Sequence, residues 1–320
     1  MRRYLGVDGG GTKTAFVLIG SDGRVLARAN LPTSDYHSHG IGRVTEVLQG
    51  GIREICDAAG IRPEGIDSAF FGLPGYGEVS AMVPQLDAAP AAILGHTRYR
   101  CNNDMVAGWA GSLGTEDGIN VIAGTGSMTY GERAGVGTRV GGWGELFGDE
   151  GSGHWIGLTG LNLFSRMSDG RLPRGPLHEF IKEHTGVTRD LDVIDVVFNR
   201  WRRGRTEIAA VSRVVAQAAD AGDPAAAEVL REAAAHLTEL VEATRHTLEF
   251  EPGETVPVSY SGGVFAAATV RERFTAALRE RSADYDLRAP LFAPVVGAAL
   301  YAAKISGHPL PAEALVRLRG

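Results

Sequence analysis

The sequence predicts an α/β protein made of two similar halves, each a mixed sheet flanked by helices. Three observations predict this class. The opening segment alternates strand-forming residues with glycine turns and then passes into helical spacing. A unit of strand, Gly-rich turn and strand occurs at 9–12 and recurs at 124–127. The chain has 320 residues and 44% hydrophobic content, which is enough for two domains with substantial cores.

The first half begins with "YLGVDGGGTKTAFVLIGSDGRVLARANLP", which predicts three antiparallel strands joined by GGGTK and by the Asp-Gly turn at 21–23. "RVTEVLQGGIREICDAAGI" then shows helical spacing and stops near Gly60. "IDSAFFGLPG" and "TRYRCNND" each run from strand-forming residues into a turn. Together these segments predict a mixed sheet with crossover helices.

The second half repeats this order. "GINVIAGTGSMTYGERAG" predicts strand, turn and strand, helices follow from about 153 to 250, and "TVPVSYSGGVF" predicts a further strand before a helix. "LFAPVVGAALYAAKISG" predicts a buried helix with Pro294 in its first turn. We expect one domain over 1–117, joined by the returning C-terminal helix at 294–320. A second domain with a helical insertion is expected over 118–293.

Composition excludes several classes. Cys56 and Cys101 are the only cysteines, too few for a disulfide framework, a structural zinc site or an iron–sulfur cluster in one chain. A net charge of −6 without a sustained basic block argues against a nucleic-acid surface, and "RWRRGR" at 200–205 is interpreted as a solvated helix end. No apolar run is long enough for a membrane span or signal peptide, which predicts a soluble cytoplasmic protein.

Two glycine loops predict phosphate binding. In "GVDGGGTKT" and "AGTGS", the glycines have no Cβ, so backbone N–H groups can approach a phosphate closely. The threonine and serine hydroxyls of these loops add further hydrogen-bond donors. The candidate phosphate-binding residues are Gly9, Gly10, Gly11, Thr12, Lys13, Gly124, Thr125, Gly126 and Ser127. Asp8, at the end of the first strand, is the candidate Mg²⁺ ligand, since this ion commonly takes one or two carboxylates together with phosphate oxygens and water. The alternative is a pair of ordinary hairpins in which Asp8 only fixes a turn.

Two further segments suit a nucleoside and a sugar. "SGGVF" places Gly262 and Gly263 at the expected start of a helix, where a nucleoside could lie against bare backbone. "GGWGELFGDEGSGHWIG" at 141–157 combines seven glycines with Trp143 and Asp149. Carboxylates accept hydrogen bonds from vicinal hydroxyls and an aromatic ring covers sugar C–H groups, so this segment predicts a carbohydrate site. The alternative is a glycine-rich hinge with core tryptophans.

"CNNDMVAGWAG" at 101–111 places Asp104 at a strand-to-helix turn. Taken alone, Asp104 fits a helix N-cap, because Asp accepts hydrogen bonds from free helix N–H groups. Without further evidence, the motif favours this capping role over a chemical one.

These motifs, "NND" and "SGG" included, resemble in order and spacing the BadF/BadG-type ATPase and N-acetylglucosamine kinase family, within the actin, sugar kinase and heat-shock-protein superfold. The likeness covers essentially the whole chain, and "GGWGELFGDEGSG" is similar to the N-acetylglucosamine kinase branch. The resemblance implies two ribonuclease-H-like domains with ATP and sugar in the cleft between them, and a possible homodimer. It implies an ATP-dependent hexosamine kinase in which Asp104 accepts the proton of the sugar 6-hydroxyl. An ordinary Asp pKa would keep this base ionised.

The same resemblance assigns the sugar contacts to Asp104, Asn103, Gly142, Trp143, Gly144 and Asp149. One position departs from the pattern: "PTSDYHSHG" has Asp35 where the branch commonly has Asn. An ionised Asp only accepts hydrogen bonds, so Asp35 could favour the ammonium of glucosamine over an N-acetyl group. A glucosamine-specific kinase, an ATPase that activates a partner and a sugar or nucleotide sensor without turnover remain the alternatives.

Overall fold

The computed structural model describes residues 1–282 and 284–319. The chain divides into two compact units, and each is described here by itself. The first unit comprises Met1–Glu116 and Ala289–Gly320, and the second comprises Asp117–Arg288.

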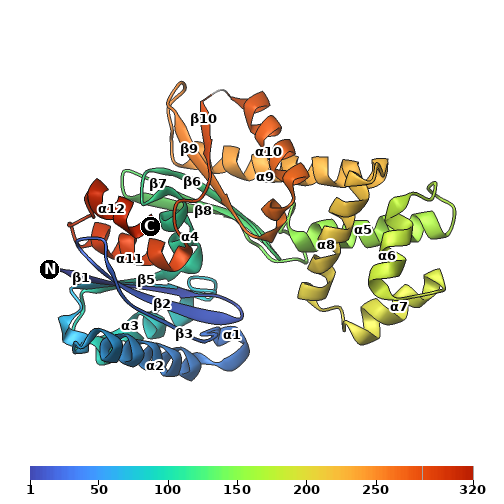
Figure 1. The fold of residues 1–320 in the computed structure, drawn as a ribbon. Helices are drawn as coiled ribbons and strands as arrows, with labels where there is room; N and C mark the ends of the chain where they lie inside the picture. Colours follow the sequence, from blue (N-terminus) through green and yellow to red (C-terminus); the bar gives the residue numbers. More distant parts are fainter. Residues whose placement is uncertain (283, 320) are drawn as a thin grey trace. The chain divides into compact units, whose positions relative to one another are not determined.

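The first unit contains a five-stranded mixed sheet in the order β3-β2-β1-β4-β5 (Figure 1). Its strands are β1 (Arg3–Gly9), β2 (Lys13–Gly20), β3 (Val25–Pro32), β4 (Ser68–Leu73) and β5 (Tyr99–Asn103). The first three strands pair antiparallel, whereas β4 runs parallel to both β1 and β5. β1, β4 and β5 therefore end at the same edge of the sheet, which brings the residues after them together.

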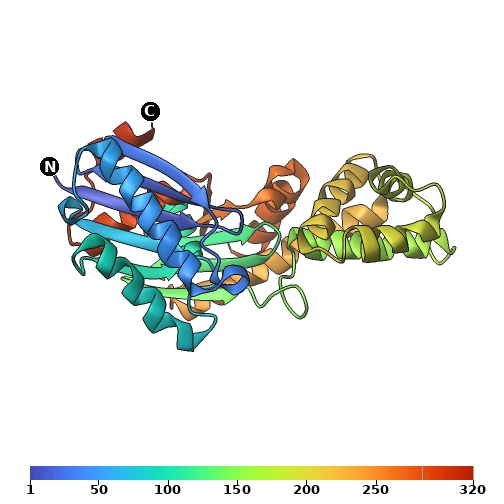
Figure 2. The same ribbon diagram turned by 90° about the horizontal axis from the view of Figure 1, so that it is seen from below.

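Helices cover both faces of this sheet, as the strand pattern requires. They are α1 (Tyr36–His39), α2 (Ile41–Ala59), α3 (Val83–Leu94), α4 (Asp104–Leu113), α11 (Pro294–Ile305) and α12 (Ala312–Arg319), with short 3₁₀ turns at Pro63–Gly65 and Ser80–Met82. Alternate side chains of a strand point to opposite faces. Leu5 and Val7 of β1 join the core beneath α2, which lies across the strands in Figure 2. Gly6 instead faces α11, where a Cβ would collide with the backbone of Ala299.

The second unit contains another five-stranded sheet, in the order β10-β9-β6-β7-β8. Its strands are β6 (Gly118–Ala123), β7 (Ser127–Arg133), β8 (Val136–Gly141), β9 (Val256–Ser261) and β10 (Tyr285–Arg288). β6, β7 and β8 pair antiparallel, and β9 runs parallel to β6 and β10. This is the strand order and direction of the first sheet, so the two halves predicted from sequence share one topology.

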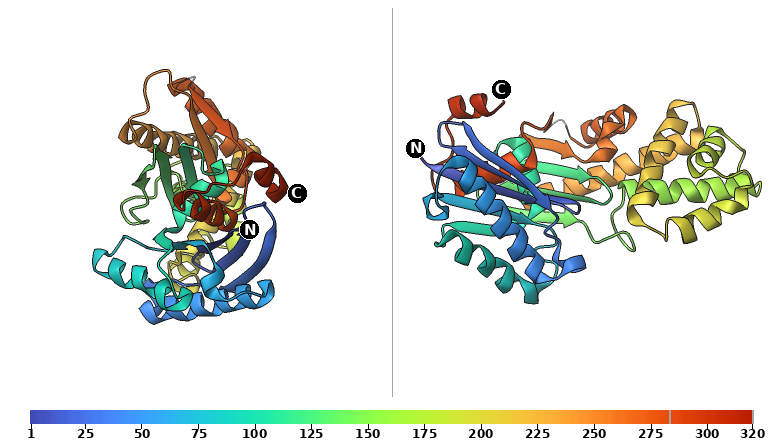
Figure 3. Two further views of the ribbon diagram at one scale, coloured as in Figure 1. Left: turned by 90° about the vertical axis from the view of Figure 1, so that its left-hand side faces the viewer. Right: turned by 60° about the horizontal axis from the view of Figure 1, so that its bottom comes forward.

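The helices of the second unit form most of its mass. They are α5 (Gly153–Ser168), α6 (Pro176–Thr185), α7 (Val193–Asp195), α8 (Arg205–Asp220), α9 (Pro224–Thr247) and α10 (Ala268–Arg281), with a 3₁₀ turn at Asp190–Asp192, a π turn at Val196–Arg200 and a 3₁₀ turn at Gly263–Ala266. Figure 3 shows α5 to α8 gathered into a helical group beside the sheet. Among the described residues, no helix combines the length and apolar character needed to cross a membrane.

Candidate functional site

The first glycine loop connects β1 to β2 at one edge of the sheet. The Gly10 N–H donates to the Lys13 carbonyl at 2.8 Å, and the Thr33 hydroxyl donates to the Gly10 carbonyl at 2.7 Å. At Gly9 a Cβ would lie 2.7 Å from Pro74 Cδ and 2.8 Å from Ser34 Oγ, so packing alone demands glycine there. At Gly11 a Cβ would meet no atom within 4 Å, and the backbone lies outside the region that favours glycine. The fold does not explain Gly11, whereas close approach of a ligand would.

Asp8 lies on β1, one residue before the end of the strand, and pairs in register with Gly72 of β4. Among the described residues its carboxylate has no hydrogen bond or ion pair. Burial raises the pKa of Asp8 to about 6, although the nearby Lys13 charge acts in the opposite direction. A partly buried carboxylate without a partner, next to an exposed loop, is costly for the fold and is suited to bind a cation.

Asp104 is the first residue of α4, directly after β5. Asn103 provides the N-cap, because its side-chain oxygen accepts the Met105 N–H at 3.2 Å. The capping function considered for Asp104 in the sequence therefore belongs to its neighbour. The Asp104 carboxylate is free of that role, which favours a chemical one.

The expectation of an ordinary pKa for Asp104 is wrong. Burial and, to a smaller extent, repulsion from the carboxylate of Asp8 raise the pKa of Asp104 to about 7, against the N–H groups of Asp104 and Met105, which favour the charged form. Gly72 lies between the two acids, and a Cβ on it would approach Asp104 Cα to 3.1 Å and the Val7 carbonyl to 3.2 Å. Gly72 lies in β4, within "FGLPG" at the end of a predicted strand, and only its position against Asp104 in the fold marks it as part of this site.

The segment after β4 completes this edge of the first unit. The buried Asn103 amide donates to the Tyr76 carbonyl at 3.3 Å, and the Tyr36 hydroxyl donates to the Gly75 carbonyl at 2.9 Å. Both groups of the Asn103 side chain are thus used inside the protein, where they hold the turn that carries Asp104. Contact of Asn103 with a sugar remains a prediction.

Asp35 is the N-cap of α1 and accepts the N–H groups of His37 and Ser38 at 3.0 and 3.3 Å. Burial alone would raise the pKa of Asp35, but hydrogen bonds from Ser38 and His37 outweigh it and hold the pKa below its ordinary value. Asp35 is therefore an ionised acceptor, as the sequence interpretation requires. Each oxygen still has capacity for a second donor.

The second glycine loop, at 124–126, connects β6 to β7 in the second unit. It is held by backbone bonds to the start of α5: the Gly153 N–H donates to the Gly124 carbonyl at 2.8 Å and the His154 N–H to the Thr125 carbonyl at 3.2 Å. The Ser127 hydroxyl is buried and donates to the Glu150 carbonyl at 2.6 Å. A Cβ at Gly124 would meet nothing within 4 Å, as at Gly11. Thr125 is exposed at the tip of the loop.

Asp149 holds the second glycine loop in place through its side chain. Its side chain is 2% exposed, pairs with the guanidinium of Arg205 and accepts the Ser127 N–H at 3.4 Å. Arg205 also bonds Glu145 at 3.2 Å. Asp149 thus fixes the loop, and contact with a sugar remains a prediction. Arg205 falls within "RWRRGR", interpreted from sequence as a solvated helix end; it is exposed at the first residue of α8, and it also pairs with Asp149, which that interpretation did not include.

The Gly142-Trp143-Gly144 segment leaves β8 with both glycines at positive φ, 72° and 88°. Arg139 donates through Nε to the Gly141 carbonyl at 3.1 Å and through its other nitrogen to the Gly142 carbonyl. The Trp143 side chain is 72% exposed. It is not a core tryptophan, and its ring is available to cover the C–H face of a sugar.

Gly262 and Gly263 follow β9 and lie against the second glycine loop. A Cβ on Gly262 would collide with the Ala123 carbonyl, and Gly262 has a φ of 101°. Gly263 is exposed and has no neighbour within 4 Å of a built Cβ. The expected helix is a short 3₁₀ turn here, and α10 begins only at Ala268.

Because the pKa of Asp104 is raised in the folded protein, the effect of Asp104→Asn on stability should depend on pH. Between about pH 4 and pH 7 the folded state keeps a proton on Asp104 that the unfolded chain releases, so wild-type stability falls as pH rises through this window. In metal-free buffer we expect Asp104→Asn to raise Tm at pH 8 by roughly 5 °C. The gain should vanish near pH 4. Thermal unfolding at both pH values measures it, and a loss of Tm at pH 8 would show that Asp104 is a structural acid.

Two five-stranded sheets of one topology, each with a glycine loop between its first two strands, define the actin-like ATPase and sugar kinase fold. The chain belongs to the BadF/BadG/BcrA/BcrD ATPase family, whose model matches residues 5–302. The family and fold class predicted from sequence are thereby confirmed.

Several relatives are named as sugar kinases. The chain is 30% identical to the N-acetyl-D-glucosamine kinase of Dictyostelium discoideum over 81% of this chain and 84% of that protein. It is 31% identical to the N-acetylmuramic acid/N-acetylglucosamine kinase of Clostridium acetobutylicum over 82% and 86% of the two chains. A solved Chromobacterium violaceum structure, assigned as an N-acetylglucosamine kinase, is 27% identical with a TM-score of 0.69, covering 94% of this chain and 98% of that one.

Proposed function

We propose that this chain is an ATP-dependent hexosamine kinase that transfers the γ-phosphate to the 6-hydroxyl of N-acetylglucosamine or a related amino sugar. The observation that carries the proposal is Asp104. Asn103 provides the helix cap in its place, and the Asp104 carboxylate is held beside Asp8 at the strand edge that carries the first glycine loop. The named activities of the relatives support the same reaction.

In the reaction, Asp104 accepts the proton of the sugar 6-hydroxyl while the hydroxyl oxygen attacks the γ-phosphorus. The bond to the bridging oxygen breaks, and ADP leaves with that electron pair. A pKa of about 7 leaves a sizeable fraction of Asp104 ionised at neutral pH and makes it a matched base, since general-base efficiency is best when the pKa lies near the operating pH. Positioning of the hydroxyl supplies much of the remaining acceleration.

The glycine loop of each unit is a candidate segment for binding ATP. Open space surrounds three glycines, two in these loops and one after β9, at which an added Cβ would meet no protein atom within 4 Å: Gly11, Gly124 and Gly263. A phosphate or nucleoside could therefore approach the backbone N–H groups there. Thr12 and Thr125 are exposed hydroxyl donors at the loop tips.

Mg²⁺ fits Asp8, because this carboxylate has no bonded partner among the described residues and adjoins the exposed first loop. When bound, the ion would supply charge neutralisation of the ATP phosphates. Trp143 would cover the sugar ring. Assembly as a homodimer remains a prediction of the family resemblance alone.

A coupled ADP-release assay over a panel of hexoses and hexosamines tests the proposal. We expect turnover that depends on an amino sugar, with N-acetylglucosamine among the best substrates. Asp35 keeps a glucosamine-specific kinase as the second candidate, because it is held ionised and only accepts. Glucosamine should then be preferred, and Asp35→Asn should shift preference toward the N-acetyl sugar. ADP release indifferent to every sugar would contradict both candidates and favour an ATPase that activates a partner.

A further inference from the structure

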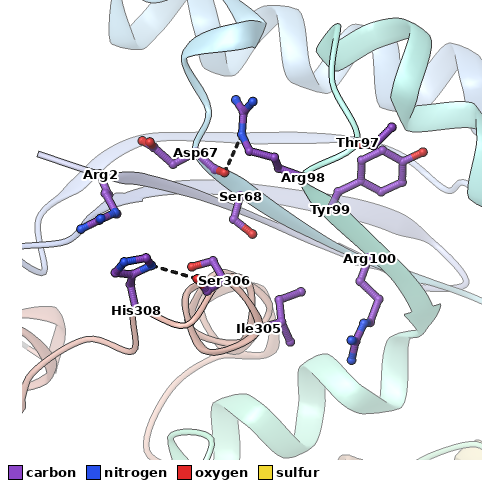
Figure 4. A pocket seen from close by; sticks show the side chains of 10 residues that line it. All are labelled: Arg2, Asp67, Ser68, Thr97, Arg98, Tyr99, Arg100, Ile305, Ser306 and His308. Carbon is purple, nitrogen blue, oxygen red and sulfur yellow. Dashed lines mark hydrogen bonds between the residues drawn. The ribbon is translucent and has the colours of Figure 1, made fainter.

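An open pocket of about 490 Å³ lies at the edge of the first sheet where its parallel strands begin. Arg2 precedes β1, Ser68 opens β4 and Arg100 is the second residue of β5. Ser306 and His308, just beyond α11, form the opposite wall (Figure 4). Asp8 lies near the far end of the strand that Arg2 precedes, and a rise of about 3.3 Å per residue puts the two about 20 Å apart. The pocket is therefore separate from the candidate catalytic edge.

The strand period explains why cationic side chains converge here. Tyr4 pairs with Ser68, and Arg100 pairs with Phe70, so these positions share the sheet face that α11 covers. The Tyr4 hydroxyl donates to the His308 carbonyl at 3.3 Å, which ties this face to the end of α11. Arg2, two residues before Tyr4, reaches the same side in Figure 4. Basic side chains from two strand starts thus face one hollow.

The pocket is positively charged in a chain whose net charge is −6. Its lining includes Arg2, Arg98 and Arg100 against one acid, Asp67, which already accepts the Arg3 N–H at 2.8 Å. Arg98 is committed to the fold, since its guanidinium donates to three backbone carbonyls at 3.0 Å. The guanidinium groups of Arg2 and Arg100 have no acceptor among the described residues.

Two internal explanations for these arginines fail. The C-terminal end of α11 could attract them through its free carbonyls. Three of the last four are already bonded: the Ala302, Ala303 and Lys304 carbonyls accept N–H groups from Ser306, His308 and Gly307, respectively, at 3.0 to 3.3 Å. The Ile305 carbonyl takes no hydrogen bond from either arginine in the described part of the chain. The Ser306 carbonyl accepts His308 Nδ1 at 2.9 Å. Asp67 also fails, because no ion pair joins it to either arginine in the described part of the chain.

The Ser68 side chain adds a hydroxyl donor to the lining of the pocket. Ser68 is 3% exposed, and its hydroxyl has no hydrogen bond among the described residues. In Figure 4 it points into the hollow between the arginines and α11. The Ser68 oxygen is not among the fully buried side-chain atoms that lack a partner, so it reaches the open hollow and can donate to a ligand there. An anion with several oxygens would accept from this hydroxyl and from both guanidinium groups.

We propose that this pocket binds a phosphate monoester of a small metabolite, at a site separate from the transfer reaction. Two guanidinium groups and a hydroxyl match the donors that a phosphate takes up, and arginine binds phosphate with two parallel hydrogen bonds. The volume exceeds that of inorganic phosphate and fits a phosphorylated sugar or similar molecule. Occupancy of this site in the first unit would then depend on the concentration of the metabolite.

Isothermal titration of the full chain with glucosamine 6-phosphate tests the proposal, with inorganic phosphate and unphosphorylated glucosamine as the other probes at constant ionic strength. The test variant is Arg2→Gln with Arg100→Gln. The control is Arg28→Gln with Arg53→Gln, which removes the same charge from two exposed arginines elsewhere in the unit. We expect the test variant to lose affinity for the monoester at least about 10-fold and the control to keep it.

Sugar-dependent turnover without added phosphate ester should be unchanged in both double variants, so this result stands apart from the success of the kinase proposal. A metabolite site is supported if wild type binds inorganic phosphate more weakly than the monoester and the Arg2/Arg100 variant loses both kinds of binding. Equal affinity of wild type and the Arg2/Arg100 variant for the monoester would overturn the proposal. The two double variants could also bind the monoester with equal affinity. Wild type would then bind it at the catalytic edge alone, and this result would overturn the proposal too.

Discussion

Asp104→Asn is expected to lower kcat for the amino sugar roughly 10³-fold. The amide keeps the size of the side chain and can remain at the first turn of α4, where Asn103 already provides the cap. It cannot accept the proton of the 6-hydroxyl. KM for ATP should change little, because Asp104 contacts the acceptor rather than the nucleotide in the proposed reaction.

The matched control is Asp57→Asn, which changes an exposed carboxylate of α2 in the same unit. Steady-state kinetics on both variants, with Tm recorded at each pH used, separates a chemical defect from a folding one. Activity of Asp104→Asn within a few-fold of wild type would refute Asp104 as the base. A matching loss in the control would point to general sensitivity of the unit to charge.

Gly11→Val should raise KM for ATP at least about 10-fold while leaving Tm near that of wild type. A Cβ at Gly11 meets no protein atom, so the substituted side chain costs the fold little and instead occupies space above the exposed N–H groups. Gly9→Val should do the reverse. Its Cβ would lie 2.7 Å from Pro74 and 2.8 Å from Ser34, which predicts a loss of about 1–3 kcal/mol in stability.

Thermal unfolding and ATP-dependent kinetics on these two variants measure the contrast. Gly42→Val serves as control, because Gly42 is also exposed without Cβ neighbours but lies in the first turn of α2. Unchanged KM for ATP in Gly11→Val would mean that the first loop is an ordinary hairpin turn. The phosphate-binding interpretation of that loop would then be wrong.

Much of this fold could be predicted from sequence because its signals are local. Glycine turns and alternating apolar residues marked β1, β2 and β3, and the segments ending at "FGLPG" and "CNND" marked β4 and β5. Pro294 correctly marked the start of α11. The 3₁₀ turn after β9 was missed, because a Gly-Gly pair before apolar residues suits either kind of helix.

The electrostatics of the site could not be predicted in the same way. Asn103 and Asp104 are adjacent and both are good caps, so only the backbone decides which residue fills that position. The pKa of Asp104 depends on its burial beside Asp8, which comes from a strand about a hundred residues earlier in the chain. Arg205 is 56 residues from Asp149, and nothing local in "RWRRGR" distinguishes it from its neighbours.

The most direct test of the central claim is product analysis by ³¹P NMR of the wild-type chain with Mg-ATP and N-acetylglucosamine or glucosamine. The account predicts ADP and a sugar 6-phosphate in equal amounts, with no phosphate transferred when the sugar lacks its 6-hydroxyl. Inorganic phosphate as the only new phosphorus species besides ADP, or a sugar phosphorylated at another hydroxyl, would contradict it.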